Sequence, residues 1–248
     1  MRKFRCFIPS GPARLLVLAH GYPWPDGSQP DDELAAYAQA AVDRWRAVAD
    51  SYDAIVAAPV FGGTRFPGYR ELTGNPARPD DYVNSLVDKL GYQYIRDFDG
   101  TFSLHGHSAG AQFAARYLIA HPARLDHVIL SAPSTYPLPD PGVDWPNGMG
   151  GGTAPVPEPG HWLTAATEVD VVVLVGTQDT EPRPAAPGQQ GSSRIERAIF
   201  WVESMRGLSQ AARAESSTRL IRADGYGHDE FALAAPAQEI LARCWTSG

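Results

Sequence analysis

The chain has 248 residues, 44% hydrophobic and 20% charged, so it is long enough to bury a sizeable core. Its net charge of −7 and pI near 5.4 argue against nucleic acid or an anionic membrane as the main partner, because both repel an acidic surface. No apolar run approaches the roughly 20 residues that cross a bilayer, and the basic start lacks the apolar core of a signal peptide. We therefore expect a cytoplasmic protein without a transmembrane segment.

Short apolar runs typical of buried strands alternate with helical stretches along the chain. Continuous apolar strands separated by helices imply a mostly parallel sheet covered on both faces. We therefore predict an α/β fold formed by one domain over residues 1–248. The expected strands are 4–8, 15–19, 54–59, 101–105, 126–131, 170–175 and 218–222, and the expected helices are 31–49, 79–90, 111–120, 193–208 and 229–244.

A Pro- and Gly-rich segment at about 133–165 interrupts this alternation and contains Tyr136 and Trp145. Two interpretations are open: a cap over a pocket, or a rigid surface crossover whose aromatic rings fill the edge of the core. Long irregular segments in compact domains are more often functional. We therefore expect a short irregular cap whose Tyr136 and Trp145 bind substrate.

The strongest functional signal is Gly106-His107-Ser108-Ala109-Gly110. G-x-S-x-G alone is a weak motif, but here it stands between an expected strand and an Ala-rich helix. Strand, motif and helix together describe a nucleophile elbow, in which a sharp turn raises the serine hydroxyl above the sheet. Ser108 is therefore the candidate nucleophile, and we expect the ring of His107 to line the substrate pocket.

A serine hydroxyl becomes a good nucleophile only when a histidine, held by a carboxylate, takes its proton. In this architecture the acid and the histidine follow the serine, each on a loop after a strand. Asp179 comes just after the strand 170–175, and His228 lies in a Gly-rich loop after 218–222. Some alternatives stay open. His161 is a rival base, and Asp140, Asp144 and Glu181 are rival acids.

An oxyanion hole needs N–H donors aimed at the negative oxygen of the tetrahedral intermediate. The backbone N–H of Ala109, at the positive start of a helix, is one expected donor. His20-Gly21-Tyr22 follows the strand 15–19 and supplies the other, the N–H of Tyr22. The next residue, Pro23, has no N–H to donate.

These residues together resemble the α/β-hydrolase superfamily: a His-Gly-x loop, a Gly-His-Ser-Ala-Gly elbow, an acid after the penultimate strand and a histidine after the last. Within it the chain looks most like small bacterial esterases and polyester-depolymerase-like proteins, through its general layout and the stretch Trp145-Pro146-Asn147-Gly148. The resemblance implies an α/β-hydrolase fold. Only residues 4–8 are available before the oxyanion strand, so one leading strand is missing or reduced.

The predicted function is hydrolysis of small-molecule or polymeric carboxylic esters through an acyl-serine, with no cofactor and no metal. Amide, thioester or carbon–carbon bond cleavage and a ligand-binding or sensing role are the alternatives. Cys6 and Cys244 have no metal-ligand spacing with a histidine, and we expect free thiols rather than a disulfide between them. The sequence leaves the oligomeric state open.

Overall fold

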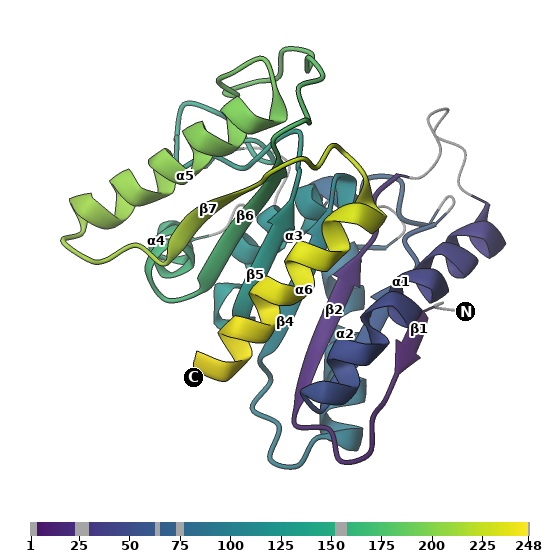
Figure 1. The fold of residues 1–248 in the computed structure, drawn as a ribbon. Coiled ribbons are helices and arrows are strands. Elements are labelled where there is room, and N and C mark those ends of the chain that lie inside the picture. The colour runs from purple at the N-terminus through teal and green to yellow at the C-terminus, as the bar shows by residue number, and fades with distance from the viewer. Residues whose placement is uncertain (1–3, 23–29, 63–64, 73–76, 152–157, 248) are drawn as a thin grey trace.

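The computed structural model describes residues 4–22, 30–62, 65–72, 77–151 and 158–247. Seven strands form one sheet in the order β1-β3-β2-β4-β5-β6-β7, and every neighbouring pair is parallel except β1 with β3 (Figure 1). The strands are β1 (Phe4–Phe7), β2 (Arg14–Ala19), β3 (Ala54–Pro59), β4 (Phe102–His107), β5 (Leu125–Ser131), β6 (Asp170–Gly176) and β7 (Thr218–Ala223). The helices are α1 (Asp31–Ser51), α2 (Pro79–Tyr94), α3 (Ala109–Ala120), α4 (Pro159–Thr167), α5 (Arg194–Ala211) and α6 (Glu230–Ser247), with short 3₁₀ turns η2 (Tyr69–Glu71) and η3 (Pro122–Arg124).

The strands divide their side chains between two cores because successive residues point to opposite faces. Leu15 and Val17 of β2 join one core, which also takes residues from α2, α3, α4 and α5. Leu16 and Leu18 join the other core, against α1 and α6, the two helices that cross the front of the sheet in Figure 1. The predicted mostly parallel sheet with helices on both faces is therefore confirmed.

All parallel strands end at one edge of the sheet, the upper edge in Figure 1. The loops that leave β2, β4, β6 and β7 therefore meet there, although they are up to two hundred residues apart in sequence. These loops carry the predicted site residues Tyr22, Ser108, Asp179 and His228, which parallel pairing of the strands brings to one edge.

The segment at about 133–165 is only partly irregular. Residues 133–151 form bends and turns, whereas α4 occupies Pro159–Thr167, so this end of the segment is helical. Residues 152–157 lie outside the described residues. The cap role of this segment and the single-domain organisation remain predictions.

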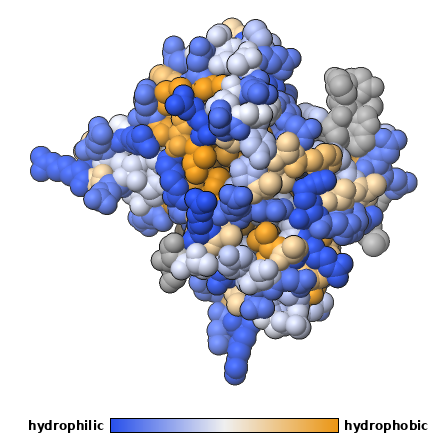
Figure 2. All heavy atoms as spheres, viewed as in Figure 1, coloured by the Kyte–Doolittle hydropathy of each residue, from blue (hydrophilic) through white to orange (hydrophobic). Residues whose placement is uncertain are grey.

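The two cysteines lie on elements at opposite sides of the sheet: Cys6 on β1 at one edge, and Cys244 near the end of α6 beside β6 and β7 (Figure 1). Both cysteines are free thiols and are half-buried. Figure 2 shows a mainly hydrophilic face with an apolar area over β6 and β7, beside α6. Among the described helices, none combines the length and the apolar character needed to cross a bilayer.

Candidate active site

Ser108 occupies a strained turn between β4 and α3. Its backbone has φ 52° and ψ −111°, a left-handed conformation that costs free energy in a residue with a side chain. Two glycines make the turn possible, because a Cβ on Gly106 would lie 2.2 Å from the Gly110 carbonyl oxygen and one on Gly110 would lie 1.9 Å from that of Ala19. The turn is held by the Ser108 N–H, which donates to the Ser131 carbonyl at 2.8 Å. This is the geometry of a nucleophile elbow.

Ser108, His228 and Asp179 form a continuous hydrogen-bonded series. The Ser108 hydroxyl lies 3.0 Å from His228 Nε2, and His228 Nδ1 lies 2.9 Å from Asp179 Oδ2. With Nδ1–H donating to the carboxylate, Nε2 is left as the acceptor of the serine proton. The structure thus brings together the three residues that the sequence analysis singled out as catalytic, and it leaves the rival base His161 at the start of α4.

The Asp179 carboxylate is buried and has a second partner, Arg194, whose Nη1 lies 2.6 Å from Asp179 Oδ1. Burial alone raises the pKa of this carboxyl group, but the hydrogen bond from His228 and the Arg194 charge outweigh it, so the pKa falls below its usual range. Arg194 is the first residue of α5, where the helix dipole disfavours a cation. That unfavourable placement is the signal by which sequence reasoning could have found it.

The loops that carry the acid and the histidine are joined by their backbones. Gln178 N–H donates to the Tyr226 carbonyl at 2.8 Å, and Thr177 N–H donates to the Ala223 carbonyl at 2.9 Å. A Cβ on Gly176 would lie 2.2 Å from the Tyr226 oxygen, so only glycine permits this approach. Asp179 and His228 are therefore positioned relative to each other by main-chain contacts as well as by their own hydrogen bond.

The loop after β2 presents Tyr22 to the same cleft as Ser108. His20 fixes this loop: it accepts from the Phe61 N–H at Nε2 (3.1 Å) and therefore donates from Nδ1 to the Gly21 carbonyl (2.7 Å). Burial lowers the pKa of His20 to about 4, so its ring is neutral near pH 7. Among the described residues, the N–H groups of Tyr22 and Ala109 donate to no acceptor. Both are therefore available to an oxyanion.

The cleft above Ser108 has a volume of about 290 Å³. His107 lines it, as expected, and its ring centroid lies 4.9 Å from that of His228. Burial lowers the pKa of His107 well below its usual range, and the neighbouring His228 adds to the effect, so the ring is neutral beside the nucleophile. The described residues that line it are Gly21, Tyr22, Tyr37, His107, Ser108, His228, Asp229, Glu230 and Phe231.

Tyr136 and Trp145 do not line this cleft, which corrects the expectation that they bind substrate there. Their exposed fractions are 0% and 5%, and both belong to the core on the α3 and α5 side of the sheet. The Tyr136 ring stacks on Trp201 with centroids 5.1 Å apart. Burying large aromatic rings is favourable, and the rings of Tyr136 and Trp145 point into this core. Their position agrees with the second interpretation of the segment, in which the aromatic rings fill the edge of the core.

Glu230 is a cleft residue that the sequence analysis did not identify. Its Oε2 accepts from the Tyr37 hydroxyl (2.6 Å) and from the Gly21 N–H (3.3 Å), so it ties α6 to α1 and to the loop after β2. Burial raises the pKa of this carboxyl group to about 7. At the first turn of α6 an acidic residue is an ordinary complement to the helix dipole, so the sequence carries no signal of this role.

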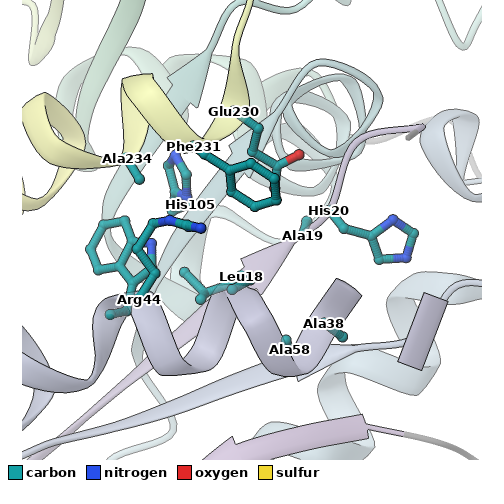
Figure 3. Close-up of a pocket in the computed structure, with 12 residues that line it drawn as sticks. Leu18, Ala19, His20, Ala38, Arg44, Ala58, His105, Glu230, Phe231 and Ala234 are labelled. Carbon is teal, nitrogen blue, oxygen red and sulfur yellow. The ribbon is translucent and has the colours of Figure 1, made fainter. Parts of the chain in front are cut away.

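Figure 3 shows a small internal cavity below the cleft, between β2, α1 and α6, with Glu230 and Phe231 of α6 on one side and Arg44 of α1 on the other. Its volume of about 20 Å³ is enough for roughly one water molecule and excludes a substrate. The Arg44 guanidinium lies 3.9 Å from the centre of the Phe231 ring. This cavity is therefore not a substrate site.

His127, Asp170 and Cys244 place possible metal-ligand atoms within 4.8 Å of one another at the amino end of β6, away from Ser108. The Arg219 guanidinium already contacts the Asp170 carboxylate and, at 3.4 Å, the Cys244 sulfur. A metal ion would have to displace that cation, so we assign no metal to this group.

No protein-family model and no curated protein matches the sequence. Among solved structures, the fold is similar to poly(aspartic acid) hydrolase-1 from Sphingomonas sp. KT-1, with a TM-score of 0.78 at 20% identity over 96% of this chain and 92% of that one. It is also similar to a poly(3-hydroxybutyrate) depolymerase from Bordetella parapertussis, with a TM-score of 0.76 at 23% identity over 99% and 83% of the two chains. A fluorophosphonate-binding serine hydrolase from Staphylococcus aureus matches with a TM-score of 0.60 at 11% identity, over 99% and 91%. The chain therefore has the α/β-hydrolase fold that its sequence predicted.

Proposed function

We propose that this protein is a serine hydrolase that cleaves carboxylic esters through a covalent acyl-serine. The observation that carries the proposal is the series Ser108–His228–Asp179 at a strained elbow, with distances of 3.0 and 2.9 Å. Nucleophile, base and orienting acid in hydrogen-bond contact are the arrangement that activates a serine. Fold similarity to proteins named as hydrolases and depolymerases is consistent with this chemistry.

In the first half of the reaction, Ser108 Oγ attacks the ester carbonyl carbon while His228 Nε2 takes its proton. The carbonyl electron pair moves onto the oxygen, and the N–H groups of Tyr22 and Ala109 stabilise the resulting oxyanion. When that intermediate collapses, the carbon–oxygen bond to the alcohol breaks and His228 returns the proton to the departing oxygen. The acyl group is then bonded to Ser108.

In the second half, water replaces the alcohol. His228 takes a proton from the water, whose oxygen attacks the acyl carbon, and the carboxylic acid leaves as Ser108 regains its proton. Asp179 keeps the His228 ring in the tautomer that both halves need, and Arg194 keeps the Asp179 carboxylate ionised and in place. The acid and the alcohol are the only products.

The two fold neighbours with the higher TM-scores are named for polymers, one for poly(aspartic acid) and one for poly(3-hydroxybutyrate). We therefore include polymeric esters in the proposed substrate class, with His107 as a wall of the subsite beside the nucleophile.

The test is steady-state hydrolysis of p-nitrophenyl butyrate, with Ser108→Ala as the variant. Loss of the nucleophile should reduce kcat by at least about 10⁴-fold, the scale of such losses in serine hydrolases. A fluorophosphonate probe should label the wild-type chain once, at Ser108. Ser85→Ala is the matched control, because Ser85 is an exposed α2 residue whose hydroxyl only contacts the Asp81 carbonyl.

Three results would reject the proposal: full activity in Ser108→Ala, labelling at another residue, or a single burst without turnover. The last would indicate that the protein binds or senses its ligand and does not turn it over.

A further inference from the structure

A second cleft, of about 270 Å³, is lined among the described residues by four arginines, Arg70, Arg116, Arg183 and Arg197, and by one carboxylate, Glu71. The chain as a whole carries a net charge of −7. The four guanidinium groups around this cleft therefore make it locally positive in an acidic protein. A concave site with low-dielectric walls concentrates the electric field of such charges.

Two of these arginines are almost completely buried, with exposed fractions of 1% for Arg116 and 3% for Arg197. Within the described residues neither forms an ion pair. Arg116 donates to neutral oxygens only: three backbone carbonyls, the Thr135 hydroxyl and the Asn147 amide. Arg197 donates only to backbone carbonyls, including that of Ser134 at 2.7 Å.

A buried cation without a counter-charge is costly, and an anion in the cleft would supply the missing charge. Burial lowers the pKa of Arg116 to about 10, so the group remains charged at neutral pH. The carboxylates that do reach the cleft arginines compensate their charge only in part, because the side chains of Glu71 and Glu181, the partners of Arg70 (3.6 Å) and Arg183 (3.1 Å), are 41% and 65% exposed to water. The cleft is therefore positive before any ligand enters.

The arginine-lined cleft adjoins the catalytic residues along α3 and through Tyr22. Gln112 lines the cleft one helical turn after Ser108, and its N–H donates to the Ser108 carbonyl at 3.0 Å. The Arg70 guanidinium lies 5.6 Å from the centre of the Tyr22 ring, and Tyr22 lines the cleft above Ser108. One helical turn rises about 5.4 Å, so the Gln112 side of the arginine-lined cleft lies about that far along α3 from Ser108, and Arg70 stands beside Tyr22, which lines the other cleft.

We propose that the arginine-lined cleft binds an anionic oxygen group, a carboxylate or a phosphate, on an arm of the substrate. This inference rests on the proposed function, because it identifies the substrate class of the same site. The enzyme then prefers esters whose acyl or alcohol part carries a negative charge a few bonds from the scissile carbonyl. Arg116 and Arg197 form the floor of the subsite, and Arg70 and Arg183 are its more exposed side chains.

The first test compares two acyl esters of matched length, mono-p-nitrophenyl glutarate and p-nitrophenyl valerate. A charged hydrogen bond contributes about 1.5–3 kcal/mol, so kcat/KM should favour the anionic ester by about 10- to 100-fold. The double variant Arg70→Gln/Arg183→Gln should bring that ratio toward one. Arg70 and Arg183 are changed because the buried Arg116 and Arg197 also form hydrogen bonds with the backbone of neighbouring loops, so their replacement could disturb the fold.

Arg96→Gln is the matched control. It removes the same charge from a side chain that is 96% exposed and lies before β4, at the opposite edge of the sheet from Ser108. The ratio should stay at the wild-type value in this control. A wild-type ratio near one, or a ratio that the double variant retains, would overturn the inference while leaving the proposed ester hydrolysis intact.

Calorimetry on Ser108→Ala with glutarate and with inorganic phosphate separates this inference from the proposed function. Binding of either anion that Arg70→Gln/Arg183→Gln weakens would support the subsite even if no ester were hydrolysed. The anion that binds more tightly identifies the arm as carboxylate or phosphate. Binding of neither anion, at concentrations that saturate ordinary ion sites, would remove the subsite.

Discussion

An aspartate–arginine ion pair lies at each end of β6, and the two pairs differ in how deeply they are buried. At the carboxyl end Asp179 pairs with Arg194, and at the amino end Asp170 pairs with Arg219. The side chains of the first pair are 1% and 5% exposed, and those of the second are 29% and 43% exposed. A buried pair must keep its geometry to avoid an uncompensated charge, whereas an exposed pair can separate into water.

Each pair also has a histidine and a potential nucleophile nearby. At the carboxyl end these are His228 and Ser108, aligned by the elbow. At the amino end they are His127 and the Cys244 thiol, whose pKa is raised to about 11 by burial and by Asp170, so the thiolate needed for attack is scarce near pH 7. Residue types alone therefore do not make a catalytic site. The two ends of β6 differ in the burial of the ion pair, in the alignment of the histidine, and in whether the nucleophile can lose its proton to that histidine.

The largest expected difference between the two ends comes from replacing the acid. Asp179→Asn should reduce kcat for p-nitrophenyl butyrate by about 10⁴-fold, because the amide no longer holds His228 in the tautomer that accepts the serine proton. Asp140→Asn is the control, since asparagine can still accept from the Gly142 N–H. If Asp179→Asn keeps more than about a tenth of kcat, the orienting acid is a different residue.

A smaller effect should follow from replacing the arginine of the buried pair. Arg194→Gln should lower kcat by about 10- to 100-fold, the value of one charge-assisted hydrogen bond. The acid limb of the pH–rate profile should also move to higher pH, because the Arg194 charge is one of the causes that lower the Asp179 pKa. Arg194→Lys keeps that charge, so its acid limb should lie closer to the wild-type pH than the limb of Arg194→Gln. An unmoved profile in a folded Arg194→Gln would limit Arg194 to a structural role.

Glu230 is another buried carboxyl group at the carboxyl edge, with its pKa shifted in the opposite direction to that of Asp179. Because burial raises its pKa to about 7, the folded state holds a proton between pH 4.5 and 7 that the unfolded state releases. The free energy of unfolding should therefore fall as the pH rises through this window, by about 1–2 kcal/mol after allowing for solvent access.

Glu230→Gln removes this titration. Urea unfolding at pH 5 and pH 8 should show a smaller decrease for the variant than for the wild type. Parallel pH dependences of the two proteins would mean that Glu230 titrates normally in the folded state.

The smallest effect is expected at the exposed pair. Asp170→Asn should leave kcat unchanged and lower the free energy of unfolding by no more than about 1 kcal/mol, the usual range for a solvent-exposed ion pair. Denaturant unfolding and butyrate turnover measured on one preparation check both parts. A catalytic loss as large as that of Asp179→Asn would break the contrast between the two ends of β6.

The sequence predicted the parts of the site that local patterns specify. Gly106 and Gly110 mark a turn that tolerates no side chain at those two positions, and the apolar strands before Asp179 and His228 place both residues after the ends of parallel strands. It predicted less well the segment around Tyr136 and Trp145. A Pro/Gly-rich composition describes the backbone of a segment, but not whether its aromatic rings face a ligand or the core.

The alternation of apolar strands and helices by itself determined the mostly parallel α/β layout, because periodicity and turn residues act over a few positions. The motifs around Ser108, Asp179 and His228 added the resemblance to α/β-hydrolases and the predicted chain order of nucleophile, acid and histidine. The tertiary structure placed Arg194, Glu230 and the four arginines of the second cleft in their surroundings. Their side chains come from η2, α3, α5, α6 and the loop after β6, and, apart from the unfavourable position of Arg194 at the start of α5, each is an ordinary polar residue in its own segment. Charge, burial and pKa depend on distances in space, which no local pattern encodes.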